Sequence, residues 1–264
     1  MNNDRKSWQM INKDKIVIAS GDGGLDSKSP LMDLYILAQA KKENPKVCLL
    51  PTAGGDDQGL IKYFYSLYNR YPCKPSHFSV FNPHTADARS FLLSQDVVFV
   101  SGGHSRCMLA LWKEYGIDTI LREAYNRGIV LSGGSAGSVC WFDQCITDSI
   151  PGRLSVMNCL GILPYSNCPH FASTSRRSAY ARFVSSGEIG SGYAADDYSA
   201  LHFVNGSFLR GVSIRPYAQV FKVGLENNTL VQKRLRTKWL GLKSYQEELV
   251  FNTAMFNRSE KESE

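Results

Sequence analysis

The fold is decided by residues 128–141, which read GIVLSGGSAGSVCW. Residues 129–131 are aliphatic or β-branched and predict a short buried strand. A Gly-x-Ser-x-Gly pentad follows at 133–137, and the apolar segment 136–142 favours the first turns of a buried helix. Strand, pentad and helix in this order are the setting of a nucleophilic serine, because the sharp turn exposes the Ser135 hydroxyl. The alternative is a glycine-rich loop that only packs tightly. The pentad fits both interpretations, and its flanks favour the nucleophile.

Length and composition predict a folded protein with no membrane-spanning segment. The 264 residues, 43% hydrophobic and 20% charged, are enough for one large α/β domain over 1–264, with the charged end 258–264 frayed. No apolar run approaches the ~20 residues that a membrane span needs. No apolar signal region follows the first residues, so we expect no export and no membrane partner.

Charge and cysteine content argue against a zinc site and a nucleic-acid partner. Seven cysteines with no Cys-x-x-Cys pair are typical of reduced thiols in a cytoplasmic protein rather than of a disulfide framework or a metal site. The net charge of +6 is scattered apart from a basic cluster, which we interpret as a solvated face. The cluster consists of Lys233, Arg234, Arg236 and Lys238.

The first half of the chain alternates between short aliphatic strands and helices. Expected strands lie at 15–20, 46–50, 78–81, 96–100 and 129–131. Expected helices lie at 31–38, 61–67 and 109–126, the last with a break at Gly116. Continuous aliphatic strands that alternate with helices predict an α/β fold, with a mostly parallel sheet and helices on both faces. Glycine-rich turns at 21–24, 52–55, 102–103 and 133–137 would then share the carboxyl edge, where ligands bind in such sheets.

The second half has a looser pattern. A helix is expected at 175–185 and short strands at 191–195 and 200–204. Asn205-Gly206 predicts a tight hairpin turn, and a further hairpin is expected between 219–223 and 229–231.

An ordered set of motifs over roughly the first 205 residues resembles the peptidase E family of serine peptidases, which includes aspartyl dipeptidase and, more distantly, cyanophycinase. The set comprises the strand end at 51–53, the segment 98–103, the Gly-Gly-Ser-Ala-Gly turn, Cys168-Pro169-His170, and the acidic stretch before Ala200-Leu201. The resemblance implies a class I glutamine-amidotransferase-like, flavodoxin-like three-layer architecture in which serine replaces the cysteine of that turn.

The resemblance also implies roles for five residues. Ser135 would be the nucleophile, His170 its general base and Asp197 the acidic third member, where relatives commonly have glutamate. The backbone N–H groups of Gly103 and Ala136 would form the oxyanion hole. Asp196 and Asp197 are adjacent and point to opposite sides of an extended chain, so only one of them can reach His170.

Substrate-binding residues are less clearly indicated. The aspartyl dipeptidase arginine that holds an N-terminal aspartate has no clean counterpart, although Arg176, Arg177 and Arg182 lie in the right region. His104 stands beside the oxyanion glycine, where relatives have asparagine or aspartate, and either lines the pocket or is a bystander.

The expected reaction is hydrolysis of a small peptide through an acyl-enzyme, with no metal and no organic cofactor. An esterase, a cyanophycinase-like isopeptidase and a non-catalytic binding relative remain alternatives. The sequence does not reveal the oligomeric state and leaves open a homodimer.

Overall fold

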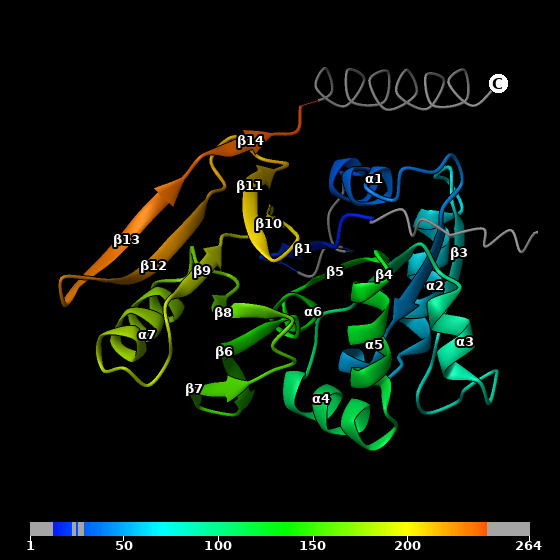
Figure 1. The fold of residues 1–264 in the computed structure, drawn as a ribbon, viewed down its shortest axis with the longest axis horizontal. Coiled ribbons are helices and arrows are strands. Elements are labelled where there is room, and N and C mark those ends of the chain that lie inside the picture. The colour runs from blue at the N-terminus through cyan, green and yellow to red at the C-terminus, as the bar shows by residue number, and fades with distance from the viewer. Residues whose placement is uncertain (1–12, 23–24, 26–28, 242–264) are drawn as a thin grey trace, which may run out of the picture.

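A sheet of eight strands forms the centre of the computed structural model, which describes residues 13–22, 25 and 29–241 (Figure 1). Its order is β14-β11-β10-β1-β5-β4-β2-β3, and the five neighbouring strands β1, β5, β4, β2 and β3 are parallel to one another. These five span Ile16–Ser20 (β1), Lys46–Leu50 (β2), Lys74–His77 (β3), Val97–Val100 (β4) and Val130–Gly134 (β5). The predicted mostly parallel sheet is therefore confirmed.

Helices cover both faces of this sheet, as expected from strands that are apolar on both sides. Helices α1 (Leu31–Ala38) and α2 (Gln58–Tyr68) pack on one face, with Ile18, Leu49 and Phe99. Helices α3 (Ala88–Leu93), α4 (Ser105–Glu114) and α5 (Ile117–Asn126) pack on the other face, with Val17, Leu50 and Val98. Gly116, with φ of 68°, separates α4 from α5 at the predicted break.

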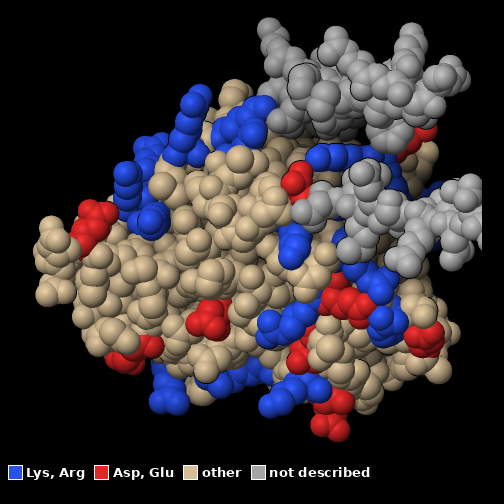
Figure 2. All heavy atoms as spheres, viewed as in Figure 1, with Lys and Arg blue, Asp and Glu red and all other residues tan. Residues whose placement is uncertain are grey.

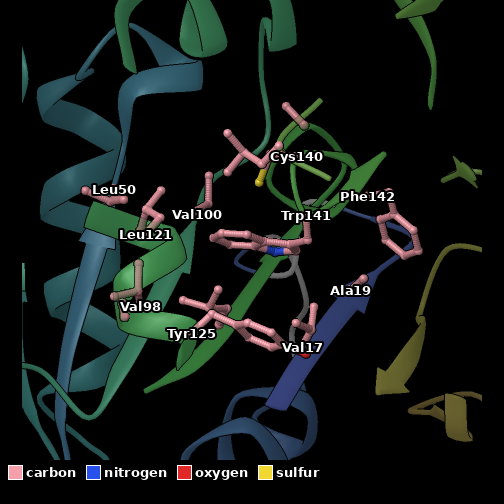
Figure 3. Packing of buried hydrophobic residues seen from close by; sticks show 14 of the residues in the cluster. Val17, Ala19, Leu50, Val98, Val100, Leu121, Tyr125, Cys140, Trp141 and Phe142 are labelled. Atoms are coloured by element: carbon pink, nitrogen blue, oxygen red, sulfur yellow. The ribbon is translucent and has the colours of Figure 1, made fainter. Parts of the chain in front are cut away.

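Trp141 lies at the centre of the second of these cores. Its fully buried ring sits among Val17, Val100 and Tyr125 in the close-up of Figure 3. The residue follows the short helix α6 (Ala136–Val139), so the segment that leaves the Ser135 turn is anchored directly in the hydrophobic core.

Three further strands extend the sheet beyond β1. Strand β10 (Ser199–Val204) is antiparallel to β1 and forms a hairpin with β11 (Ser207–Ser213). Asn205 and Gly206 both have positive φ, which a two-residue hairpin of the predicted kind requires. Strand β14 (Thr237–Trp239) runs parallel to β11 at the edge.

A second sheet of six strands, at the left of Figure 1, was only partly predicted. Its order is β13-β12-β9-β8-β6-β7. The strands span Phe142–Ile150 (β6), Arg153–Asn158 (β7), Leu163–Cys168 (β8), Gly192–Ala195 (β9), Val220–Glu226 (β12) and Thr229–Leu235 (β13). Helix α7 (Thr174–Ser185) packs Tyr180, Phe183 and Val184 against it. The sequence pattern predicts α7, β9 and the β12–β13 hairpin but not β6, β7 or β8.

Two predicted elements are wrong in position or length. A strand was expected at 78–81, but the strand that pairs with β2 is β3, at residues 74–77. Phe78 and Val80 follow it and are buried, which explains why the apolar pattern pointed to them. The helix expected over 136–142 ends at Val139, since Trp141 enters the core and Phe142 already begins β6. The expected frayed end 258–264, and Gly23 and Gly24 of the first glycine-rich turn, lie outside the described residues.

The basic cluster predicted at 233–238 lies on β13, on β14 and on Arg236 between them, and Lys and Arg gather over this end of the molecule in Figure 2. Both strands are at sheet edges, where charged side chains discourage pairing with another chain. Within the part of the chain that the structure describes, no helix is long and apolar enough to cross a membrane.

Candidate active site

The turn that carries Ser135 has the strained geometry expected of a nucleophile turn. Ser135 joins β5 to α6 with φ of 53° and ψ of −111°, an unusual conformation for a residue with a side chain. Glycine is required on both sides for steric reasons. A Cβ on Gly133 would lie 2.5 Å from the Val100 carbonyl oxygen, and one on Gly137 would lie 2.1 Å from the same atom. The two glycines let α6 approach β4 closely and leave Ser135 at the sheet edge.

His170 reaches this turn from the second sheet. It follows β8 and has φ of 53°, and its backbone N–H donates to the Gly21 carbonyl at 3.1 Å. Its Nε2 lies 3.0 Å from the Ser135 Oγ. The next residue, Phe171, donates its backbone N–H to Ala195, so the main chain on both sides of the imidazole is fixed.

Asp197 lies on the other side of the imidazole. Its Oδ1 is 2.5 Å from the His170 Nδ1, and the two side chains are 44% and 30% exposed. An ionised carboxylate only accepts hydrogen bonds, so Nδ1 carries the proton in this pair. The Nε2 of the neutral ring is then the acceptor for the Ser135 hydroxyl.

The neighbouring Asp196 is held away from the imidazole. It accepts the Gln219 backbone N–H at 3.1 Å, and burial raises its pKa, partly opposed by that hydrogen bond. Of the two aspartates, Asp197 is therefore the one that contacts His170, whereas Asp196 contacts Gln219, the residue before β12.

The loop after β4 brings Gly103 to the same edge. Gly103 has φ of 138°, and a Cβ there would lie 2.2 Å from the Ala53 carbonyl oxygen. Only glycine fits this position. Among the described residues, no protein acceptor takes the backbone N–H of Gly103 or of Ala136, the first residue of α6.

His104 has a structural partner that the sequence did not suggest. Its Nδ1 accepts the Cys107 backbone N–H at 3.2 Å and so caps the start of α4. Histidine here takes the capping position that asparagine or aspartate commonly fills at helix starts.

The three arginines suggested for substrate binding all contact other side chains of the protein, although the buried Nε of Arg177 has no acceptor among the described residues. Arg176 pairs with Asp148 at 2.6 Å. The Arg177 guanidinium lies over the Phe171 ring at 4.6 Å, and that of Arg182 lies over the Phe183 ring at 4.3 Å. Each of these contacts is explained by packing of α7 on its surroundings.

The loop after β1 makes contacts to the site that its sequence did not indicate. Besides the Gly21 carbonyl that holds His170, the Asp22 carboxylate accepts the backbone N–H of Tyr198, next to Asp197, at 2.9 Å. A Cβ on Gly21 would lie 2.1 Å from the Asp196 carbonyl oxygen. The only signal for this role in the sequence was the run of glycines at the end of the first strand.

Over the described ranges, no three His, Cys, Asp or Glu side chains come close enough together to hold a metal ion. All seven cysteines are unpaired thiols, and the closest two, Cys145 and Cys159, have their sulfurs 3.5 Å apart.

A hydroxyl, an imidazole and a carboxylate joined in this order at a strained strand-to-helix turn form the arrangement used by serine hydrolases. Comparison with known proteins identifies the particular group. The sequence profile of Peptidase family S51 matches residues 16–210, and the chain belongs to this family. The protein is accordingly a serine peptidase.

Individual relatives agree with this assignment. The chain is 44% identical over 230 residues to the uncharacterized peptidase YgaJ of Bacillus subtilis (strain 168), a match that covers 86% of this chain and 100% of that protein. It is 30% identical over 128 residues to peptidase E of Haemophilus influenzae (strain Rd), covering 45% of this chain and 59% of that protein.

Solved structures share the fold at low identity. A peptidase from an acI-B1 actinobacterium has a TM-score of 0.63 and 16% identity, covering 86% of this chain and 96% of that one. A structure described as a peptidase E protein from Listeria monocytogenes EGD-e has a TM-score of 0.56 and 15% identity, covering 74% and 97%.

Proposed function

We propose that this serine peptidase hydrolyses small peptides, in the manner of a dipeptidase, with Ser135 as nucleophile, His170 as general base and Asp197 as the group that orients the base. The observation that carries the proposal is the continuous chain of hydrogen bonds from Asp197 through His170 to the Ser135 Oγ, with lengths of 2.5 and 3.0 Å. Both the imidazole and the carboxylate are partly exposed, so a peptide can approach the serine from solvent.

The reaction proceeds by two acyl transfers. His170 Nε2 accepts the Ser135 hydroxyl proton as Oγ forms a bond to the peptide carbonyl carbon. The backbone N–H groups of Gly103 and Ala136 donate to the resulting oxyanion, and the loss of one such donor typically costs about 10²- to 10³-fold in rate. The imidazolium then gives its proton to the leaving amine as the C–N bond breaks. Water, deprotonated by His170, then attacks the acyl carbon; the ester bond to Oγ breaks, and the imidazolium returns its proton to Oγ, which regenerates Ser135.

Asp197 contributes by fixing the imidazole. Its carboxylate holds the proton on Nδ1 and stabilises the imidazolium that forms during each transfer. Aspartate is shorter than the glutamate common in relatives. The loop that carries it is held by the hydrogen bond from the Tyr198 backbone N–H to Asp22, and Tyr198 has a positive φ of 66°.

We also propose a cytoplasmic location, because seven unpaired thiols suit a reducing compartment. Fractionation of the native host followed by immunodetection tests this, and recovery of the protein outside the cytoplasm would contradict it.

Hydrolysis of a dipeptide panel by the wild type and by Ser135→Ala tests the enzymatic proposal. The panel contains peptides with aspartate, asparagine, leucine and arginine at the first position, together with an ester and an isopeptide. We expect dipeptides to be cleaved by the wild type and not by Ser135→Ala. Ser138→Ala, three residues further along, is the matched control and should retain activity. Preferred cleavage of the ester or the isopeptide would replace the dipeptidase assignment.

A further inference from the structure

The proposed oxyanion donor Gly103 lies in a short span that has no hydrogen bonds of its own. Gly102 and Gly103 lie between β4 and α4, and neither makes a backbone hydrogen bond to the described part of the chain. Ser101, just before them, donates its N–H to the last residue of β2 at 3.2 Å, and His104, just after them, donates to the Ala53 carbonyl at 2.7 Å. Glycine adopts many backbone conformations, so the direction of the Gly103 N–H depends on how these two ends are held.

His104 holds the second end through its side chain as well as its backbone. Its Nδ1 accepts the Cys107 backbone N–H at 3.2 Å, and its carbonyl accepts that of Met108 at 3.1 Å. The first N–H groups of a helix have no partner within the helix, and a capping side chain supplies one. The imidazole therefore joins the glycine span to the first turn of α4.

Helix α4 is itself fixed to the turn that holds the backbone of His104. Its Trp112 is fully buried, and the indole N–H donates to the Thr52 Oγ1 at 3.2 Å. Thr52 and Ala53 belong to the same short 3-10 turn, η1 (Thr52–Gly54), which follows β2. A rigid helix and a rigid turn thus lie beside the span, and the cap is a side-chain contact that extends this rigidity to His104.

Loss of the cap would loosen the span without removing the glycine. The Cys107 N–H would have no acceptor, the first turn of α4 would open more readily, and His104 would be held by its backbone alone. Gly103 would then present its N–H to an oxyanion for a smaller fraction of the time. Because loss of a whole oxyanion donor typically costs about 10²- to 10³-fold in rate, this partial loss should cost less.

We propose that His104 is a positioning residue for the oxyanion hole: its imidazole caps α4 and thereby keeps the Gly103 N–H oriented for the oxyanion. The role needs no contact between His104 and the substrate. It requires only a hydrogen-bond acceptor at the cap, which an asparagine side chain also supplies. The inference rests on the proposed function and adds a residue to its machinery.

Kinetics of His104→Ala and His104→Asn, with the dipeptide that the wild type cleaves best, test this role. His104→Ala removes the acceptor and should lower kcat by roughly 10- to 50-fold while KM stays within about 3-fold, because the oxyanion forms only after the substrate is bound. His104→Asn keeps an acceptor for the Cys107 N–H and should stay within about 3-fold of the wild type in both constants. His104 is exposed, so both replacements leave the hydrophobic core intact.

The matched control removes a cap from a helix far from Ser135 in the sheet order. Asp87 caps α3, where its carboxylate accepts the Ser90 backbone N–H at 2.8 Å. Asp87→Ala and His104→Ala should lower the urea midpoint of unfolding by similar amounts, but only His104→Ala should lower kcat. Equal kcat values for these two variants would overturn the proposal. So would an effect of His104→Ala confined to KM, or a His104→Asn that is as slow as His104→Ala.

Ser135→Ala, measured beside these variants, separates this inference from the proposed mechanism. If Ser135→Ala is inactive while His104→Ala keeps the wild-type kcat, the role of His104 is contradicted and the serine mechanism stands. If Ser135→Ala keeps its turnover, the proposed mechanism fails, and the role of His104 in it fails as well.

Discussion

Two groups of hydrogen-bonded polar side chains in this molecule consist of similar residues but differ in exposure. At the carboxyl edge of the sheet, Asp197, His170 and Ser135 form one partly exposed chain. Beneath α1, Asp33 accepts from the Tyr68 hydroxyl at 3.1 Å, and Tyr35 is hydrogen-bonded to His202 at 2.6 Å, all of them buried.

Burial is the largest cause of the pKa shifts in the second group. It raises the pKa of Asp33 to about 7, opposed by the Tyr68 hydrogen bond and reinforced by repulsion from Asp22. It also lowers the pKa of His202 to about 4, with a further contribution from the positive charge of Arg210. The pKa shifts of this buried group therefore arise mainly from burial, whereas the hydrogen-bonded chain at the sheet edge is partly exposed to solvent. The difference predicts that changes at the edge affect activity and changes beneath α1 affect stability.

The largest expected effect is that of His170→Gln. Removing the base should lower kcat/KM by about 10⁴-fold or more, because the serine hydroxyl is then not deprotonated. The free energy of unfolding, measured with urea, should change little since the side chain is partly exposed. A variant that retains more than a tenth of the wild-type activity would contradict the assigned role.

Asp197→Asn should have a smaller effect, about 10²- to 10⁴-fold on kcat/KM, because the amide no longer fixes the proton on Nδ1. The matched control is Asp196→Asn, whose amide oxygen can still accept the Gln219 N–H. It should remain within about 3-fold of the wild type. The assignment of Asp197 would be wrong if Asp196→Asn lowered kcat/KM by this amount while Asp197→Asn stayed close to the wild type.

Asp33→Asn should affect stability and leave kcat/KM unchanged. Between the usual carboxyl pKa of 3.8 and the raised value of about 7, the folded protein holds a proton that the unfolded chain releases, so wild-type stability falls as pH rises through this window. The variant lacks this dependence, and its gain should reach on the order of 1–4 kcal/mol at pH 8 and vanish near pH 4.

Urea unfolding of both proteins from pH 4 to pH 8 measures this gain. The titration of His202 acts in the opposite direction, because its pKa is lowered in the folded protein and stability falls as pH falls below the usual histidine pKa of 6.5. This contribution is the same in the wild type and in the variant, so it cancels in the difference. A gain that does not vary with pH would contradict the raised pKa of Asp33.

Tyr35→Phe should have the smallest effect. It removes the hydroxyl bonded to His202 and leaves a buried ring nitrogen without that partner, a cost of about 1–2 kcal/mol in unfolding free energy. Activity at saturating substrate should match the wild type. A loss of activity with unchanged stability would show that the region beneath α1 communicates with the edge.

The sequence predicted the parts of the fold in which local pattern and burial agree. Strands β1, β2, β4 and β5 are aliphatic because both faces are covered, and this pattern is visible without tertiary information. Strand β3 reads Lys-Pro-Ser-His and is at an edge, so its pairing with β2 leaves no hydrophobic signal. Strands β6 to β8 were missed because their burial depends on α7 and on the second sheet.

The candidate site also contains residues that the sequence predicted and contacts that it did not. Ser135 is identifiable from its turn, and the resemblance to peptidase E supplied His170 and Asp197. The contacts of Gly21 and Asp22 with His170 and Tyr198 join segments far apart in the chain, so no local pattern encodes them.

The central claim is that the Ser135 hydroxyl is activated, and covalent labelling tests it most directly. The wild type is incubated with a fluorophosphonate at neutral pH and the modified residue is identified by peptide mass spectrometry. We expect one adduct per chain, on Ser135, and none in Ser135→Ala. A folded wild-type protein that remains unlabelled, or that carries the adduct on a different serine, would contradict it.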